Sequence, residues 1–368
     1  MRRLFAVVPV ITPLLPGPSR ARQLPVSRRK EPTIVKKHTA RIGIAVILCL
    51  LVLSMGAFAG GEWKPKKPIN LIVPWGPGGA SDLTARIVAS EMEKPLGQRI
   101  AITNTPGGSG AIGTKAMFDA PHDGYTWSGN ANGSIVTYQV LDFLNVSHRD
   151  YANFFAVFTP NVICVPANSP FKDIPALLSA MKSKKITVSS AGTGSGGHQA
   201  AEFFKTYAKV NYVHVPYQGG VYAVTAAVSG EVDAVMQLSM EVVEMLRAKQ
   251  LRALAVMDNV PLEVDGVGQI PPITNWIPEF PSVGSYFGLF LPKDIPADAN
   301  ESITNAFKTA TSSPAVKKFA ADKGSKAVCI YGTEAEKINE SAASLISWLL
   351  FDNGIAKKSP SDFGIRRP

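Results

Sequence analysis

Cysteine is scarce in this chain, and the spacings that bind metals or form redox centres are missing. Only 3 of the 368 residues are cysteines, and no two of them stand near each other in the sequence. Cys164 and Cys329 each lie in an apolar stretch. We therefore expect two buried free thiols in preference to one disulfide, and neither a metal nor a cofactor.

A basic excess is missing too, once the first 59 residues are set aside. Residues 1–59 contain ten Lys or Arg and one acid, Glu31, so they carry +9 of the formal net charge of +10. Residues 60–368 are left with +1. A surface this close to neutral gives no electrostatic reason to expect nucleic acid or an acidic membrane as a partner.

The first 59 residues have the pattern of a signal peptide. Their basic part ends at Arg41, an apolar run follows over 42–55, and small residues, Ala57 and Ala59 among them, come next. An uncleaved anchor is the alternative, because the run approaches the ~18 residues at which a membrane span becomes possible. The run ends in small residues with no basic stop-transfer flank, which favours cleavage after Ala59 and export to the periplasm.

The rest of the chain alternates between short apolar segments and amphipathic ones. Its length of roughly 310 residues is enough for two lobes with separate cores. Strands are expected at 70–74, 99–104, 186–190, 213–216, 234–237 and 253–256, and helices at 198–208, 222–229, 242–249 and from 298 to about 352. This alternation predicts an α/β protein with mainly parallel sheets flanked by helices, whose ligands bind at the carboxyl ends of the strands.

Two apolar segments mark the expected passages between the lobes. Residues 154–166 carry the chain into the second lobe, and 286–291 bring it back. The expected parts are a leader over 1–59, the first lobe over 60–158 and the second lobe over 159–285. Residues 286–368 then form the hinge return and the C-terminal part of the first lobe.

The first of two glycine-rich turns lies between an expected strand and the helix after it. It begins at Trp75 and contains Gly78, Gly79, Ala80, Ser81 and Asp82. Glycine lets backbone N–H groups face a ligand, and the following helix adds the positive end of its dipole. We expect this turn to bind a carboxylate, with Asp82 as an internal brace or helix cap because its own charge repels an anion. The alternative is an ordinary strand-to-helix turn.

A second turn of the same kind spans 189–198. Ser190, Thr193 and Ser195 offer hydroxyl groups beside the N–H of Gly194, and His198 falls in the first turn of the next helix. The helix dipole there favours the neutral imidazole, which binds a ligand or simply holds the loop. Ser195 and His198 also suggest a nucleophile and a base, but Thr193 stands at the first glycine position of a G-x-S-x-G elbow. We therefore do not expect an enzyme.

Further candidate ligand-binding residues follow or precede other expected strands. Asn130 and Asn132 come after a turn and strand expected at 123–129. Tyr217 follows another strand and either covers the ligand or packs against Trp75. Asp233 precedes the strand at 234–237, where it touches the ligand or caps a turn. No Lys or Arg occurs in 74–82, 129–134, 189–198 or 214–220. An anion held by these segments depends on N–H groups, hydroxyls and ordered water.

A dinucleotide-binding fingerprint is matched only superficially. Gly108, Gly110 and Gly113 follow a strand with the spacing G-x-G-x-x-G. A lone match is weak evidence, and no acidic residue closes a second strand at the required distance. No phosphate-loop lysine is present either. We therefore expect no nucleotide cofactor.

Taken together, the order and spacing of several segments resemble the Bug (TctC-like) extracytoplasmic solute receptors of tripartite tricarboxylate transporters. They include Ile-Val-Pro-Trp-Gly-Pro-Gly-Gly-Ala-Ser-Asp over 72–82, Gly-Thr-Gly-Ser-Gly-Gly-His over 192–198, and the segments 104–113, 121–125, 215–219, 230–233, 251–255 and 287–292. The resemblance covers nearly all of the chain after the leader. Two positions depart from it: Trp75 stands where Phe is common, and Thr105 where Arg is usual.

The resemblance implies a fold and a function. The fold is a two-lobed periplasmic binding protein of type II, a Venus flytrap, whose hinged cleft holds a carboxylate between 75–82 and 190–198. The function is that of a monomeric receptor that delivers a small carboxylate to the membrane subunits of a tripartite tricarboxylate transporter. A sensor that passes the capture event to a signalling partner is one alternative, and a periplasmic hydrolase using Ser195 and His198 is another.

Overall fold

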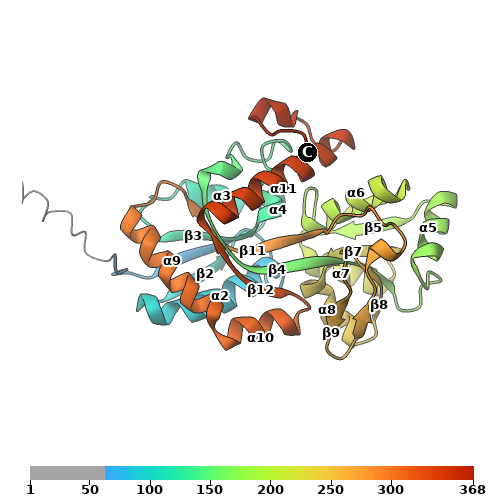
Figure 1. The fold of residues 1–368 in the computed structure, drawn as a ribbon, viewed down its shortest axis with the longest axis horizontal. Coiled ribbons are helices and arrows are strands. Elements are labelled where there is room, and N and C mark those ends of the chain that lie inside the picture. The colour runs from blue at the N-terminus through green and yellow to red at the C-terminus, as the bar shows by residue number, and fades with distance from the viewer. Residues whose placement is uncertain (1–62) are drawn as a thin grey trace, which may run out of the picture. The chain divides into compact units, whose positions relative to one another are not determined.

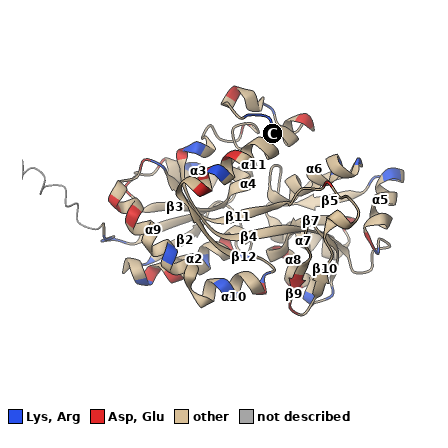
Figure 2. Cartoon of the chain, viewed as in Figure 1, with Lys and Arg blue, Asp and Glu red and all other residues tan. Residues whose placement is uncertain are grey.

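The computed structural model in Figure 1 describes residues 63–368. The expected leader and its cleavage after Ala59 lie outside these residues. No helix within 63–368 is long and apolar enough to cross a membrane. Lys, Arg, Asp and Glu lie mainly on helices and loops, whereas the central strands carry few of them (Figure 2). The charge pattern therefore identifies the strands as the core.

The first group of strands is parallel. β1 (Ile69–Val73) pairs with β2 (Ile100–Asn104) on one side and β3 (Thr126–Ala131) on the other. Three helices follow these strands in turn: α2 (Ala80–Leu96), α3 (Ala111–Phe118) and α4 (Asn132–Ile135). α2 buries Val88 and Met92 completely, and it ends where Gly97 adopts a left-handed φ of 65°. The expected strand–helix–strand order is confirmed here.

The second group repeats the pattern. β5 (Thr187–Ser190), β6 (Val213–Pro216) and β7 (Ala234–Leu238) are parallel, and β8 (Leu251–Val256) runs antiparallel to β4 (Tyr151–Pro166). The helices of this group are α5 (Ile174–Ser183), α6 (Gly196–Ala208), α7 (Gly220–Ser229) and α8 (Ser239–Arg247). A short hairpin of β9 (Leu262–Val264) and β10 (Gly268–Ile270) follows β8. For β5 to β8 and α6 to α8 the expected bounds agree with the structure to within about three residues, whereas α5, β9 and β10 were not predicted.

Two strands run between the groups (Figure 1). β4 pairs with β11 (Gly284–Pro292) and β12 (Lys326–Tyr331) along its first part, and with β7 and β8 along its last part. In the described residues the strand order is therefore β2-β1-β3-β11-β4-β7-β5-β6. The expected two-lobed α/β fold is confirmed, and β4 and β11 contain the two apolar passages. The exact lobe boundaries at 158 and 285 stay a prediction.

The C-terminal part corrects one expectation. The segment from 298 to 352 was expected to be helical throughout, but β12 interrupts it between α10 (Pro314–Asp322) and α11 (Gly332–Asp352), after α9 (Ala297–Ser312). Gly324 with φ 62° ends the turn after α10, and the following apolar residues pair with β4. A short apolar run does not distinguish strand from helix by periodicity, because either element can bury it.

The expectation of two buried thiols is right for Cys164 and wrong for Cys329. Both cysteines are free. Cys164 lies in β4 and is fully buried, so burial raises the pKa of its thiol. Cys329 is exposed, because it falls between Ala327 and Ile330, where β12 loses its register with β4.

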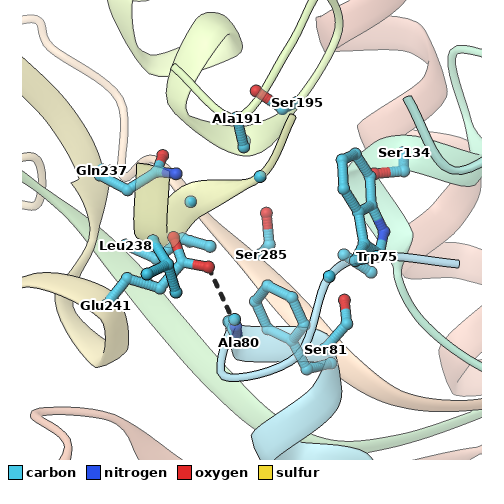
Figure 3. Close-up of a pocket in the computed structure, with 18 of the residues that line it drawn as sticks. Trp75, Ala80, Ser81, Ser134, Ala191, Ser195, Gln237, Leu238, Glu241 and Ser285 are labelled. Atoms are coloured by element: carbon cyan, nitrogen blue, oxygen red, sulfur yellow. Dashed lines mark hydrogen bonds between the residues drawn. The ribbon is translucent and has the colours of Figure 1, made fainter. Parts of the chain in front are cut away.

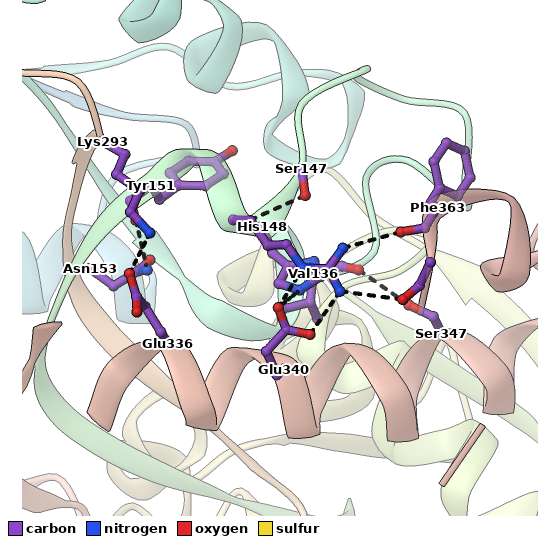
Figure 4. Close-up of polar contacts among 12 residues, drawn as sticks. Val136, Ser147, His148, Tyr151, Asn153, Lys293, Glu336, Glu340, Ser347 and Phe363 are labelled. Carbon is purple, nitrogen blue, oxygen red and sulfur yellow. Dashed lines mark hydrogen bonds and ion pairs between the residues drawn. The ribbon is translucent and has the colours of Figure 1, made fainter. Parts of the chain in front are cut away.

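A cluster of hydrogen bonds and ion pairs joins α11 to the segment before β4 (Figure 4). The Arg149 guanidinium donates to both carboxylate oxygens of Glu340 and to the carbonyl of Phe363. The hydrogen bond from Arg149 is the main reason why the pKa of Glu340 is lowered. Both side chains are nearly half exposed, so the pair orients α11 and contributes little to the free energy of unfolding.

Phe307 provides a test of the hydrophobic core around the first group of strands. Its side chain is fully buried in α9, and its ring meets that of Phe154 in β4 edge-on with centroids 5.4 Å apart. We expect Phe307→Ala to lower the free energy of unfolding by about 3–5 kcal/mol, because it removes buried apolar contacts and leaves a cavity. Denaturant unfolding of the purified protein measures this loss. Phe351→Ala is the control: Phe351 is 36% exposed, and its loss should cost less than about 1 kcal/mol. Equal losses would contradict this assignment of the core.

Candidate functional site

A pocket opens where five strands of the two groups end (Figure 3). The residues that line it come from the turns after β1, β3, β5, β6 and β7, and from β11. They are Trp75, Gly76, Pro77, Gly79, Ala80, Ser81, Ala131, Ser134, Ala191, Ser195, Gly196, Gly219, Gly220, Val221, Tyr222, Gln237, Leu238, Glu241, Ser285 and Phe287. Carboxyl ends of parallel strands are the usual place for a ligand in an α/β fold. Both glycine-rich turns meet here, as their positions predict.

Trp75 forms one wall of the pocket and is held from behind. Its indole N–H donates to Asn130 Oδ1 at 3.0 Å, and the Asn130 amide donates to Thr114 Oγ1 and Tyr138 Oη. Asn130 is 1% exposed and does not line the pocket. Its place is therefore behind Trp75, where it orients the indole, and the expected direct contact with a ligand is not supported by its position.

Gly110, one of the fingerprint glycines, has a packing role behind Trp75. It adopts φ +91°, and a Cβ there would lie 3.1 Å from Trp75 ring atoms and 2.7 Å from Tyr138 Oη. A side chain at this position would push the indole away. Gly108 and Gly110 line a neighbouring hollow, together with Trp75. Gly110 therefore serves the packing of Trp75.

Asp82 is an internal brace, as its charge predicts, and it does not line the pocket. It accepts hydrogen bonds from the N–H of Gly78 at 2.9 Å, from the Asn104 amide and from both ends of the Arg86 fork. Burial alone would raise the pKa of Asp82, but the hydrogen bonds from Arg86, Gly78 and Asn104 outweigh it and lower the pKa. These bonds hold the first turn of α2 and its glycines in place.

A carboxylate of the protein itself, that of Glu241, binds at the N-terminus of α2, which the sequence did not reveal. The N–H of Ala80 donates to Glu241 Oε1 at 2.9 Å, although the two residues are 161 positions apart (Figure 3). Glu241 lies in the first turn of α8, after β7. Burial raises the pKa of its carboxyl to about 7, against the opposing effect of the Ala80 N–H and the nearby Gln237 amide. The search for glycine-rich turns missed Glu241 because no glycine separates β7 from α8.

The second glycine-rich turn places Ser195 at the pocket and its other candidates behind it. Ser195 caps α6 by accepting a hydrogen bond from the N–H of His198. Ser190 is buried and bonds to Gly192 and to His214. The N–H of Gly194 donates to Nδ1 of His198, so this glycine and this histidine hold the loop. Thr193 lines the neighbouring hollow.

The serine–histidine pair of the hydrolase alternative does not form. The Ser195 hydroxyl accepts from the backbone N–H of His198, and the His198 ring accepts from Gly194. A serine nucleophile needs its hydroxyl directed to the ring of its base. The structure gives no support to that alternative.

His198 forms a buried stack with His214, which the sequence analysis did not foresee. The rings are 3.9 Å apart and inclined by 6°. Desolvation by burial lowers the pKa of both histidines to about 4, so both are neutral at neutral pH. The expectation of a neutral imidazole at His198 is confirmed, with burial as its main cause. His214 Nε2 then lies 2.7 Å from the Ser190 hydroxyl.

Three other candidate residues, Asn132, Tyr217 and Asp233, are not among the residues that line the pocket. Asn132 accepts the N–H of Tyr286 and joins the turn after β3 to β11. Tyr217 lines the neighbouring hollow with Trp75, and its hydroxyl donates to Glu231. Asp233 lies at the amino end of β7, where it accepts from the N–H and hydroxyl of Thr187. Asp233 therefore holds the start of β5 at the end of the strands opposite to the pocket, and its expected ligand contact is not supported.

Lining residues that the sequence analysis missed include Ser134, Ser285 and Gln237, besides Glu241. The signal that would have found Ser134 and Gln237 is position: Gln237 lies near the end of β7, and Ser134 lies in the short helix that follows β3. Within 63–368, no group of three or more His, Cys, Asp or Glu side chains is arranged to hold a metal ion.

The histidine stack predicts a pH dependence of stability. An unfolded histidine titrates near pH 6.5, whereas both folded ones stay neutral down to about pH 4. Between these values the unfolded state binds more protons, so the free energy of unfolding falls as the pH falls. We expect a loss of at most about 1.4 kcal/mol per pH unit from each histidine. His214→Gln should make this decline shallower. Denaturant unfolding of both proteins between pH 4 and 8 tests this, and identical slopes would refute it.

Comparison with known proteins agrees with this geometry. The family profile described as "Tripartite tricarboxylate transporter family receptor" matches residues 84–343. The UPF0065 protein in the tcbD-tcbE intergenic region of Pseudomonas sp. (strain P51) is 33% identical over 291 residues, which cover 75% of this chain and 84% of that protein.

Solved structures have the same fold. One described as a periplasmic transporter matches with a TM-score of 0.73 and 28% identity, over 79% of this chain and 99% of the other. MatC from Rhodopseudomonas palustris, solved with bound malate, matches with a TM-score of 0.67 and 24% identity, over 78% and 98% of the two chains. The chain therefore belongs to the family of tripartite tricarboxylate transporter receptors, and it has the fold of the periplasmic binding proteins.

Proposed function

We propose that this receptor captures a small carboxylate in the pocket at the strand ends and delivers it to the membrane subunits of a tripartite tricarboxylate-type transporter. The observation that carries the proposal is the convergence of four helix starts on one pocket. α2, α6, α7 and α8 each contribute residues from their first turn or the turn before it. The positive ends of their dipoles favour a bound anion. MatC, whose structure contains malate, has the same fold.

The polar groups around the pocket suit a carboxylate that is held without a cation. Ser81, Ser134, Ser195 and Ser285 offer hydroxyl groups, and the glycine-rich turns offer backbone N–H groups. No Lys or Arg is among the lining residues that the structure describes. Hydroxyls and N–H groups hold a carboxylate by directed hydrogen bonds, and water completes the set. We assign Trp75, Gly79, Ser81 and Ser195 to ligand binding, and add Ser134 and Ser285. Ala80 lines the pocket, but its N–H is already bonded to Glu241.

Delivery requires a conformational change that the connections allow. β4 and β11 are the strands that run between the two groups, so bending at these strands opens or closes the pocket. The closed form, which the ligand stabilises, is the form that the membrane subunits recognise. In this proposal the receptor acts in the periplasm after cleavage of its leader behind Ala59, and it does so as a monomer.

Thermal unfolding tests the proposal. The mature protein is heated with a panel of mono-, di- and tricarboxylates, aromatic acids and acidic amino acids. A ligand that binds only the folded state raises the midpoint, and at 100 times its Kd it adds about 2.7 kcal/mol to the stability. If no acid in the panel moved the midpoint, the carboxylate assignment would fail.

A pair of variants tests whether the pocket is the binding site. Ala191 lines the pocket, so Ala191→Leu should fill it and weaken binding at least tenfold, while the unfolding midpoint without ligand stays close to wild type. Ala321 is exposed at the end of α10, and Ala321→Leu should leave the Kd unchanged. Titration calorimetry measures both values. A wild-type Kd in the Ala191 variant would exclude this pocket.

A further inference from the structure

Glu241 is the one lining residue with a formal charge among those that the structure describes. A pocket built for an anion by helix starts, serines and glycines therefore contains a carboxylate of its own. Nothing in the proposed function explains this residue. The residues around Glu241 indicate which charged and hydrogen-bonding groups the ligand must have.

The Glu241 carboxylate already fills the start of two helices. Oε1 accepts the N–H of Ala80 at 2.9 Å at the start of α2. The carboxylate also lies against Gly220 at the start of α7, where any Cβ would overlap it. A ligand carboxylate at the N–H of Ala80 would have to displace Glu241 and would then face a like charge. The negative end of the ligand therefore belongs elsewhere in the pocket.

The same wall presents hydrogen-bond acceptors that have no donor. Glu241 Oε2 is shielded from solvent, and although the Gln237 amide lies nearby, no hydrogen bond reaches this oxygen from the described residues. Gln237 is 1% exposed, lines the pocket, and its Oε1 is also without a partner in this part of the chain. Buried acceptors are normally satisfied, so two of them at a binding site indicate a donor on the ligand. The raised pKa of the Glu241 carboxyl, about 7, agrees with a charge that lacks a cation.

The opposite wall has the complementary character. Figure 3 shows Gln237 and Glu241 on one side of the pocket, and Trp75 and Ser134 on the other. Ser195, at the start of α6, lies above the space between them in this view. Serine hydroxyls and the start of a 13-residue helix are donors that suit a carboxylate. The pocket is thus divided into an acceptor side and a donor side.

We propose that the ligand is an amino carboxylate, whose ammonium group binds Glu241 and Gln237 and whose carboxylate binds the side of Ser134 and Ser195. This inference rests on the proposed function and narrows its substrate class. An ammonium group carries three donors, so it can satisfy both acceptors and neutralise the Glu241 charge when the pocket closes. An ionised plain dicarboxylate brings no donor for either acceptor.

The test compares acids that differ only in the amino group. Titration calorimetry at neutral pH gives the Kd of the full mature protein for aspartate and succinate, for glutamate and glutarate, and for alanine and propionate. We expect the amino member of at least one pair to bind at least tenfold more tightly than its partner. N-acetylation of that ligand, which removes the ammonium charge and keeps the carboxylates, should cost a similar factor.

A variant and its matched control locate the preference. Glu241→Gln keeps the shape and an acceptor for Ala80 but removes the charge, so it should reduce the preference for the amino member to less than threefold. The control is Glu244→Gln. Glu244 lies one turn later on α8, outside the pocket, and forms ion pairs with Lys323 and Arg247. Its substitution should leave the preference for the amino member unchanged. The acetylated ligand tests the same contact in the wild-type protein, so the result does not depend on the folding of the variant.

The outcomes separate the two proposals. If the plain acids bind as tightly as the amino acids or more tightly, the inference about Glu241 is wrong and the carboxylate receptor stands. If amino acids bind but the Glu241→Gln preference equals that of wild type, the inference is also wrong. If no acid with or without an amino group binds, the proposed function fails and the inference falls with it.

Discussion

Because β4 pairs with strands of both groups, one stretch of backbone belongs to both cores of the described chain. β11 runs beside it, and the two strands come so close at Gly288 that any Cβ there would overlap the carbonyl of Phe154. This glycine marks the register shift between Phe287 and Gly288. The strand ends of both groups thus reach the same pocket from a shared framework, and hydrogen bonds such as those from Ala80 to Glu241 and from Gln199 to Gly133 also join their turns.

The sequence predicts well what depends on local pattern. The turn from Trp75 to Asp82 and the turn around Ser195 both lie at the pocket, because glycine between a strand and a helix has few other uses. β12 was missed because its residues pair with β4, about 170 positions away, and their own periodicity does not distinguish strand from helix. Glu241 was missed because no glycine marks the turn before α8, and because its hydrogen bond from Ala80 joins two segments far apart in the chain.

Polar residues next to a site divide into those that meet the ligand and those that hold the wall. Asp82 has four hydrogen-bond donors around it and Asn130 bonds through both ends of its amide, so neither has capacity left for a ligand. Sequence position alone placed both among the candidates. What distinguishes them is satisfaction of their hydrogen-bonding groups, a property of the folded chain. Ser134, which no motif marks, lies at the pocket itself.

The same criterion, whether hydrogen-bonding groups are satisfied within the protein, separates Glu241 from Asp82 and Asn130. A pocket lined by helix N-termini binds anions without any basic side chain, because the helix dipoles are already present in the fold. Such a pocket does not discriminate between anions. A carboxylate of the protein's own at the start of α2 changes that, because it occupies one attractive position and repels a second negative charge from it. A pocket that is positive at the start of α6 and negative at Glu241 prefers a ligand with both charges over one with a single sign. Selectivity then comes from one side chain that faces the helix starts, while the glycine turns stay as general as those of a plain carboxylate site.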